Sequence, residues 1–294
     1  MQRRTFILQS ALAIPSISFI AKSFAVDPWT IKMLNKTTGI FTEKGGTILF
    51  KFTKAGIVVV DSQFPDQADH LISELKKQHP APFELLINTH HHGDHTGGNI
   101  KFKGLVNRVL AHTNSKANQM RVAQTNNTES NQLYPSQTFD KTWSEKIGKD
   151  KFTLQYFGAG HTNGDSLIYL EKDGLVHMGD LMFNRRHPFV DRSAGANIAS
   201  WIKVLDQTIS TFPTKTTFIW GHAAEGYQVT GNADDLKAFK NYLDALLNFT
   251  SKEIAAGKSK EEIIKATEIP GAPQWKGDGA GRPLTAAFEE LTMK

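Results

Sequence analysis

The pattern of apolar and polar positions predicts a hairpin, a helix and a short buried strand in the first third of the chain. Residues 47–52 and 57–60 are rich in β-branched and aromatic side chains and are separated by a short turn, which is typical of a β-hairpin. Residues 67–78 place apolar side chains at helical spacing on one face. Residues 84–88 form an apolar strand that leads directly into the polar stretch 89–95.

The same order, an apolar strand followed by a polar cluster, recurs later in the chain. Strand-like runs cover residues 152–157, 166–170, 175–178 and 218–220, helical patterns cover 234–256 and 260–267, and a loop at 270–283 precedes a last short helix. Side chains that can bind metals follow the ends of several strands, where loops converge in a strand-rich fold. No linker divides residues 26–294, so we expect them to form a single domain.

Composition narrows the classes of protein to consider. Of the 294 residues, 39% are hydrophobic and 21% are charged, as in an ordinary globular protein with a sizeable core. The chain has no cysteine, which excludes disulfides, thiolate metal ligands and a cysteine nucleophile. The net charge is +5, of which the three cations among residues 1–25 supply +3. The remaining +2, without a basic run interleaved with aromatics, gives no case for nucleic acid as a partner.

The N-terminus has the features of an export signal. Two arginines are followed by the mostly apolar residues 6–20 and by the small-residue ending Ser23-Phe24-Ala25. This apolar stretch is shorter than the roughly 20 residues that span a bilayer. We therefore expect residues 1–25 to be a signal peptide removed after Ala25 rather than a stable membrane anchor; a buried N-terminal helix is the alternative. Residues 3–7 resemble the twin-arginine motif, so the predicted location is periplasmic or secreted.

The densest chemical signal is the stretch Thr-His-His-His-Gly-Asp-His at residues 89–95. Histidine and aspartate are poor core residues unless they are paired, but both are standard zinc ligands. In extended backbone, residues i and i+2 point the same way, so His90 and His92 can bind one metal together. Gly93 permits a tight turn, after which Asp94 and His95 can face a second metal.

This stretch resembles the His-x-His-x-Asp-His signature of the metallo-β-lactamase superfamily, and residues 96–99 resemble its glyoxalase II and related hydrolase branches. Three later pieces match further motifs of the superfamily in the expected order: Gly160-His161-Thr162, Gly179-Asp180 and Gly221-His222. The match covers roughly residues 40–225. The resemblance implies an α/β fold, a four-layer αββα sandwich, with the site along one edge of two packed sheets.

The resemblance also implies a site with two zinc ions per chain, with manganese or iron as alternative metals. The first ion would be bound by His90, His92 and His161, the second by Asp94, His95 and His222, and Asp180 would bridge both. In the best-known β-lactamases of this fold the position of Asp180 is often cysteine. The aspartate here favours the broader hydrolase branches over lactamase activity.

Residues beyond the ligands have weaker signals. A loop after the bridging position carries Asn184, Arg185, Arg186 and Arg192, which can bind a substrate carboxylate or form a solvated basic loop. Asp165 either caps a turn or supports His161 as a hydrogen-bond acceptor. Residues 39–46 are either a mobile flap or a plain hairpin loop. The remaining histidines are assigned as follows: His91 structural, His70, His79 and His112 at the surface or helix ends, His177 on a core strand, and His187 with a possible pocket role.

These features predict an exported zinc-dependent hydrolase of a small carbonyl substrate, which is a β-lactam, lactone, ester or thioester. The nucleophile would be a metal-bound hydroxide, with Asp94 and Asp180 as the catalytic carboxylates. Two alternatives stay open: a non-catalytic periplasmic protein that binds zinc or a partner, and a phosphodiesterase of the same fold. An iron redox site of the flavodiiron kind is disfavoured because those proteins usually have Glu where His92 stands. Neither the substrate's identity nor the oligomeric state follows from the sequence.

Overall fold

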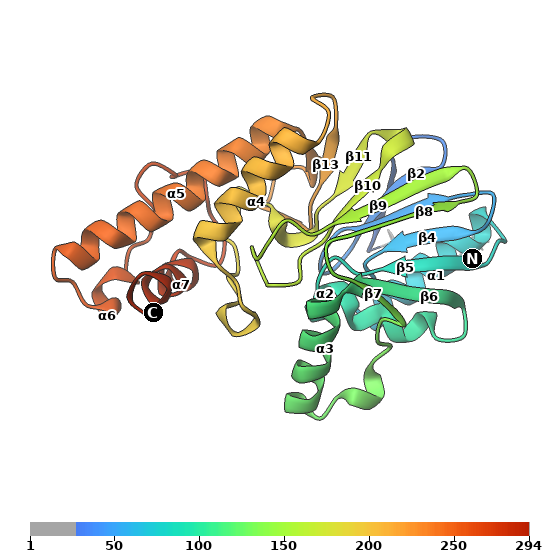
Figure 1. Cartoon of the computed structure of the whole chain (residues 1–294), viewed down its shortest axis with the longest axis horizontal. Helices are drawn as coiled ribbons and strands as arrows, with labels where there is room; N and C mark the ends of the chain where they lie inside the picture. Colours follow the sequence, from blue (N-terminus) through green and yellow to red (C-terminus); the bar gives the residue numbers. More distant parts are fainter. Residues whose placement is uncertain (1–27, 294) are drawn as a thin grey trace, which may run out of the picture.

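Two β-sheets pack face to face in the computed structural model, which describes residues 28–293 (Figure 1). The predicted signal at residues 1–25 lies outside the described residues. The first sheet has seven strands in the order β1-β2-β3-β4-β5-β6-β7, antiparallel from β1 to β4 and parallel from β4 to β7. Its strands are β1 (Thr30–Met33), β2 (Thr38–Thr42), β3 (Ile48–Phe52), β4 (Ile57–Val60), β5 (Phe83–Ile87), β6 (Val106–His112) and β7 (Gln137–Phe139). The hairpin predicted from residues 47–60 is confirmed as β3 and β4.

The second sheet has six strands in the order β15-β13-β11-β10-β9-β8. Its strands are β8 (Thr142–Ile147), β9 (Asp150–Gln155), β10 (Leu167–Leu170), β11 (Leu175–His177), β13 (Thr217–Ile219) and β15 (Thr230–Gly231). Strands β11 and β13 are parallel neighbours, and the other pairs are antiparallel. A separate parallel pair joins β12 (Phe183–Asn184) to β14 (His222–Ala223).

Helices cover the outer faces of both sheets. Helix α1 (Pro65–Gln78) packs on the first sheet, and α4 (Ile198–Thr211), α5 (Ala233–Ala255) and α7 (Gly281–Thr292) form a layer on the second. Apolar side chains fill the space between the sheets as a third cluster. In β4, Val58 and Val60 face this inner cluster while Ile57 and Val59 face α1. These layers confirm the predicted αββα sandwich.

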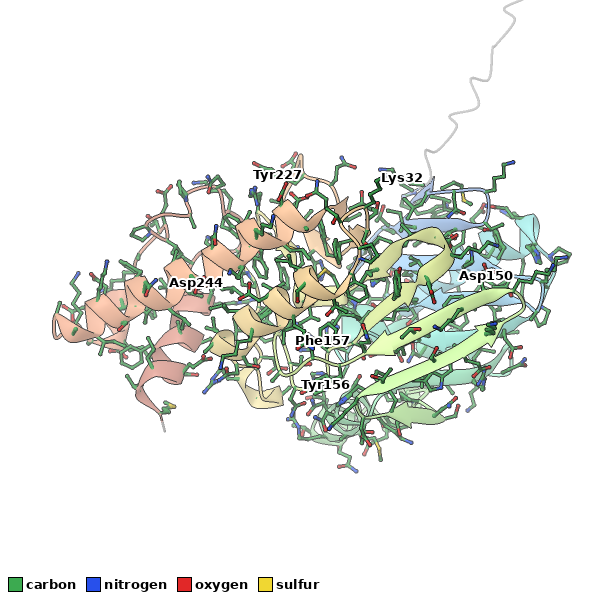
Figure 2. The ribbon with its side chains drawn as sticks, turned by 45° about the horizontal axis from the view of Figure 1, so that its top comes forward. Lys32, Asp150, Tyr156, Phe157, Tyr227 and Asp244 are labelled. Atoms are coloured by element: carbon green, nitrogen blue, oxygen red, sulfur yellow. The ribbon has the colours of Figure 1, made fainter. Side chains whose placement is uncertain are left out.

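Element boundaries differ from the sequence prediction by a few residues. Helix α1 begins at Pro65, because proline is tolerated in a first helical turn. The helix predicted over residues 260–267 is shorter, as α6 (Lys260–Ile263). Figure 2 shows Asp150, at the hairpin of β8 and β9, and Asp244, in the middle of helix α5, on opposite sides of the molecule. Within residues 28–293, no helix is long and apolar enough to cross a membrane.

Candidate metal centre

Four loops bring the predicted metal ligands to one edge of the sandwich. The strand β5 leads into the histidine stretch, whose His92 is extended (φ −63°, ψ 149°) and precedes the one-turn helix α2 (Gly93–Thr96). His161 lies between β9 and β10, and Asp180 follows β11. His222 begins β14, just after β13. All seven predicted ligand side chains therefore meet in one place, although they come from four separate parts of the chain.

Three histidines form the first ligand group. The Nδ1 atom of His92 lies 3.1 Å from Nε2 of His90 and 2.9 Å from Nε2 of His161. A carboxylate oxygen of Asp180, Oδ2, is 3.6 Å from the same His161 nitrogen. The ligand atoms of these four residues all lie within 4.8 Å of one another.

The outward ring nitrogens of this group are tied to acceptors. Nε2 of His92 donates to Oδ2 of Asp191 at 2.9 Å, and Nδ1 of His161 donates to the carbonyl of Phe189 at 2.7 Å. Nδ1 of His90 lies 3.0 Å from the hydroxyl of Thr89, which itself donates to a carboxylate and so accepts from the ring. Each outward nitrogen therefore carries the proton.

A neutral imidazole that carries its proton on the outward nitrogen presents a lone pair on the nitrogen that faces the other ligands. Burial lowers the pKa of His161 to about 3 and holds that of His90 well below its ordinary value, so both rings are neutral at neutral pH. The inward nitrogens of His90 and His161 are acceptors, and each lies about 3 Å from Nδ1 of His92, which is also an acceptor. Such an arrangement is repulsive without a cation between the atoms, and it fits a divalent metal.

The second ligand group combines carboxylates with histidines. Nε2 of His222 lies 3.0 Å from Oδ2 of Asp94, and Nε2 of His95 lies 3.7 Å from the same oxygen. Nδ1 of His95 faces Oδ2 of Asp61 at 2.7 Å, which directs Nε2 toward the centre. Burial alone lowers the pKa of His222, but the carboxylates of Asp180 and Asp94 outweigh it and raise this pKa to about 9.

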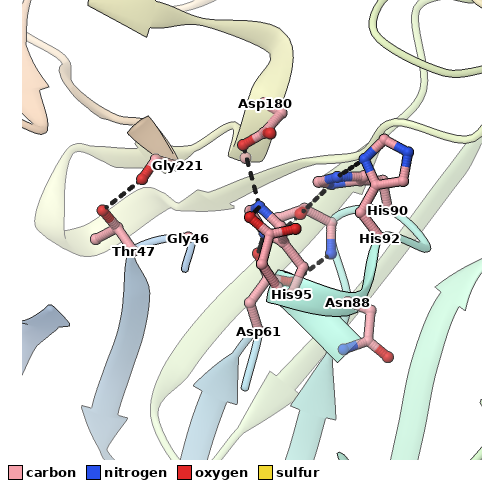
Figure 3. Close-up of polar contacts among 12 residues, drawn as sticks. Gly46, Thr47, Asp61, Asn88, His90, His92, His95, Asp180 and Gly221 are labelled. Atoms are coloured by element: carbon pink, nitrogen blue, oxygen red, sulfur yellow. Dashed lines mark hydrogen bonds and ion pairs between the residues drawn. The ribbon is translucent and has the colours of Figure 1, made fainter. Parts of the chain in front are cut away.

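Asp180 contacts residues of both groups, and Figure 3 shows its contact with His95. Its Oδ1 is 3.1 Å from Nε2 of His95, and its Oδ2 is 3.4 Å from Nε2 of His222. The buried Oδ1 and the His95 Nε2 atom have no hydrogen-bond partner in the described chain. Burial raises the pKa of Asp180, but His222 and His95 outweigh it and hold this pKa well below its usual range. An ionised carboxylate that reaches both groups fits a bridging ligand.

Two glycines let backbone approach this centre closely. A Cβ atom on Gly46 would overlap the ring of His95, and one on Gly221 would overlap the carboxylate of Asp180. Gly46 belongs to the loop between β2 and β3. Its backbone nitrogen donates to the carbonyl of Asp94 at 3.1 Å. Of residues 39–46, the first part is the strand β2, and the rest is a hairpin loop packed on the site.

Two carboxylates missed by the sequence analysis orient the ligands. Asp61, fully buried with a left-handed φ of 65°, accepts from the backbone nitrogen and hydroxyl of Thr89 as well as facing His95. Asp191 faces His92. The position of Asp61 directly after a buried strand was a usable signal. Asp191 lies in the loop after β12, where the sequence analysis considered the arginines as substrate-binding residues and did not consider this carboxylate.

Other predicted residues take definite places. Asp165 caps a turn, accepting from the backbone nitrogen (2.8 Å) and hydroxyl (2.6 Å) of Thr162, while the carbonyl of Phe189 supports His161. His91 is buried, with no hydrogen-bond partner for either ring nitrogen in the described chain. Five other histidines remain. His177 lies on β11, His79 is the C-cap of α1, and His70 bonds Glu43. His112 is the N-cap of α3 (Thr113–Asn126) but is buried rather than at the surface, and His187 lies 2.9 Å from the hydroxyl of Tyr242.

An open cavity of about 780 Å³ lies over the ligands. Its walls include Phe64, Asp94, Arg186, Phe189 and His222. A smaller space of about 230 Å³ adjoins the ligands of both groups and is also bordered by His187, Asp278 and Arg282.

Three of the predicted substrate-binding residues are directed elsewhere. Asn184 donates to the carbonyl of Gln228. The guanidinium of Arg185 lies over the ring of Trp275, 4.6 Å from its centroid. Arg192 pairs with Glu290 at 3.3 Å and donates to the Ala196 carbonyl. None of the three borders the two cavities described above, so their placement does not support the predicted role. Of the predicted arginines, only Arg186 borders them.

A family model described as the metallo-beta-lactamase superfamily matches residues 47–240, two thirds of the chain and all seven ligand positions. The chain belongs to the metallo-β-lactamase superfamily. It is 24% identical over 216 residues to the metallo-beta-lactamase type 2 of Elizabethkingia meningoseptica, covering 73% of this chain and 80% of that protein. It is 25% identical over 230 residues to the metallo-beta-lactamase IND-1 of Chryseobacterium indologenes, covering 74% and 90%.

Two further similarities extend this membership. A hydroxyacylglutathione hydrolase of Synechococcus is 29% identical over 132 residues, which is 44% of this chain and 45% of that protein. The solved metallo-beta-lactamase from Pontibacter korlensis superposes with a TM-score of 0.62 at 19% identity, covering 74% of this chain and 99% of that one. Family membership and the ligand groups together support a metal-dependent hydrolase of the metallo-β-lactamase fold.

Proposed function

We propose that the protein is a dizinc hydrolase that cleaves a small carbonyl substrate: a β-lactam, a lactone, an ester or a thioester. The observation that carries the proposal is the pair of ligand groups joined by Asp180, with inward lone pairs in the first group. Bound zinc supplies a Lewis acid and lowers the pKa of coordinated water to about 7.

The protein's own residues contribute charge, orientation and a binding wall. Asp94 and Asp180 place two negative charges against the four positive charges of two zinc ions, so the site stays cationic and favours an oxyanion. The carboxylate of Asp94 is partly exposed (28%) at the cavity wall, where it can accept a proton from water or orient it. Phe64 and Phe189 give the cavity apolar walls for the rest of the substrate.

The relatives favour carbonyl chemistry over phosphodiester chemistry. Both kinds of hydrolase among them are named for carbonyl compounds, a lactam and an acylglutathione. Asp180 at the bridge favours the broader hydrolases over the lactamases. This supports a lactone, ester or thioester at least as well as a lactam.

A substrate panel tests the proposal. Zinc-loaded protein is assayed on a chromogenic cephalosporin, an acyl-homoserine lactone, a thioester and a phosphodiester, with and without chelator. Chelator-sensitive turnover of any of the first three is the expected result. Turnover of the phosphodiester alone would show the wrong chemistry. Two tightly bound zinc ions without turnover would favour the non-catalytic binding protein.

We also propose that the chain is exported and trimmed after Ala25, and that residues 26–294 form a single domain. Support comes from the charged, apolar and small-residue order of residues 1–25. Intact-mass measurement on protein from the periplasm should give Val26 as the first residue, and the trimmed chain should unfold in one transition. An untrimmed cytosolic protein contradicts the export proposal. Two separated transitions contradict the single domain.

A further inference from the structure

The chain beyond residue 240, outside the family match, reaches back to the metal cavity. The backbone nitrogen of Lys276 donates to the carbonyl of Arg185 at 2.9 Å, and that of His187 donates to the carbonyl of Lys276 at 3.0 Å. These bonds hold residues 276–282 against the loop that follows β12. As a result, Asp278 and Arg282 border the smaller cavity beside the ligands of both groups.

The charged side chains at this cavity differ in whether they have partners. Arg186 pairs with Asp278, Nη2 to Oδ2 at 3.0 Å. Glu43, on the wall of the larger cavity, already contacts Gln67 and His70. Arg282 is exposed and has no hydrogen bond or ion pair with any residue of the range 28–293.

The backbone at Arg282 is held by buried neighbours, although its side chain forms no hydrogen bond or ion pair within residues 28–293. Ala280 is 1% exposed and Leu284 is fully buried, so the residues on both sides are fixed in the helical layer. The guanidinium therefore borders the cavity from a rigid helix start rather than from a loose tail.

We propose that Arg282 is a specificity-determining residue that binds a carboxylate of the substrate while the scissile carbonyl lies at the ligands. This inference deepens the proposed hydrolase and rests on it. A guanidinium binds a carboxylate through two parallel N–H donors, which gives orientation as well as attraction. The side chain of Phe189, 46% exposed, borders the same cavity and can contact the apolar part of the substrate between the two ends.

Asp278 adds a second element to the same preference. Its carboxylate pairs with Arg186 and borders the same cavity as Arg282, and the hydrogen bond and charge of Arg186 first and then the charge of Arg282 lower the pKa of Asp278. A substrate with one carboxylate is attracted by Arg282, whereas further negative charge meets Asp278. The site therefore selects carbonyl compounds with a single carboxylate over neutral or multiply charged analogues.

Binding, rather than turnover, gives the sharpest test. The probes are a short series of ω-mercaptocarboxylates and the matching mercaptoamides, in which the thiolate binds zinc and only the far end differs. Their affinities for the zinc-loaded full chain are measured by calorimetry at low and high salt. For at least one chain length, the carboxylate should bind roughly tenfold more tightly than the amide, an advantage that salt reduces.

Arg282→Gln should bring this ratio close to one without changing the affinity for the amides, and Arg282→Lys should retain part of it. Lys203→Gln, which alters an exposed cation on α4 that borders neither cavity, is the control and should keep the full ratio. Asp278→Asn should raise carboxylate affinity, because it removes a negative charge and frees Arg186. This variant tests the same cavity even if the Arg282 variants fold poorly.

A wild-type protein without carboxylate preference at any chain length overturns the inference, as does an unchanged ratio in Arg282→Gln or a loss of carboxylate affinity in Asp278→Asn. The proposed function can fail separately. If no carbonyl substrate is hydrolysed but the ratio still depends on Arg282, the hydrolase proposal is wrong and the carboxylate site stands.

Discussion

The two ligand groups lie next to each other but control protons in opposite ways. In the first group, His90 and His161 are buried among other rings, and burial keeps them neutral. In the second group, His95 and His222 face carboxylates. Burial lowers the pKa of both, but Asp180 and the other carboxylates outweigh it and raise both pKa values.

This difference means that a metal can bind the first group without displacing protons from His90 and His161, whereas metal binding to the second group must displace protons from its histidines. The neutral rings of His90 and His161 already present lone pairs. In the second group a metal replaces protons that hold ion pairs together, such as His222 with Asp94 at 3.0 Å. In the metal-free protein, therefore, the pKa values favour protonated rings at His95 and His222 but neutral rings at His90 and His161.

Removing the bridge should have the largest effect because Asp180 belongs to both groups. Asp180→Ala deletes the carboxylate that contacts His95, His161 and His222, so the metals should bind at least about 100-fold more weakly and activity should fall with them. Elemental analysis after gel filtration, beside hydrolysis rates, measures both. Full activity with one tightly held ion would show that the two groups do not act as a unit.

The second prediction concerns the protons of the second group. His222, with a pKa raised to about 9, and His95, also raised, are protonated in the metal-free protein at pH 7. Metal binding there should release about two protons, so affinity should rise with pH by about 100-fold per unit until pH 9 is approached. His90 and His161 of the first group, whose pKa values burial lowers, should release almost none.

Calorimetry in buffers of different ionisation enthalpy counts these protons. The first and second equivalents of zinc should then give different counts. Equal proton release for both equivalents would mean that the contrast between the groups is absent in solution.

The third prediction separates the groups through the carboxylates behind them. Asp61→Asn loses a charge that faces His95, and Asp191→Asn loses one that faces His92. Each should weaken one metal by roughly 10–100-fold and affect the other less. Cobalt substitution followed by visible spectroscopy distinguishes the two sites. If both variants weaken the same site, the assignment of the carboxylates to separate groups is wrong.

The sequence predicted most of the fold and the seven side chains that the structure brings together at the candidate site, for a physical reason. A continuous run of β-branched apolar residues marks a strand that is buried on both faces, as in β4. The candidate metal ligands are His and Asp residues in close local spacing, as in residues 90–95. Both signals are local. The family match and the four-layer structure confirm the family and the fold that they indicated.

What the sequence did not predict depends on contacts between distant segments. Asp61 faces His95 across 34 positions, and Asp278 meets Arg186 across 92. No local pattern marks such pairs. The arginines of the loop at 185–192 were chosen for their charge, yet Arg185 and Arg192 are occupied by Trp275 and Glu290, which lie far along the chain. Contacts between distant segments of the chain therefore decide which arginine side chains are occupied and which can bind a substrate.

The smallest predicted effect concerns the loop that carries His161. Burial raises the pKa of Asp165 to about 7, although its hydrogen bonds from Thr162 work in the opposite direction. An unfolded aspartate has a pKa of about 3.9. Between these values the folded protein keeps a proton that the unfolded chain has lost, so the free energy of unfolding falls as pH rises from about 4 to about 7.

Asp165→Asn mimics the protonated aspartate and should therefore remove the fall in the free energy of unfolding between about pH 4 and about pH 7 that Asp165 causes. At pH 5 the variant should be no more stable than the wild type, since asparagine offers Thr162 one acceptor oxygen instead of two. At pH 8 it should gain about 1–2 kcal/mol relative to the wild type, a value reduced by relaxation around the charge. Urea unfolding of metal-free protein across this pH range measures the difference, with Asp244→Asn on α5 as the control. A stability difference that stays constant between pH 5 and pH 8 would mean that Asp165 is already ionised in the folded protein at pH 5.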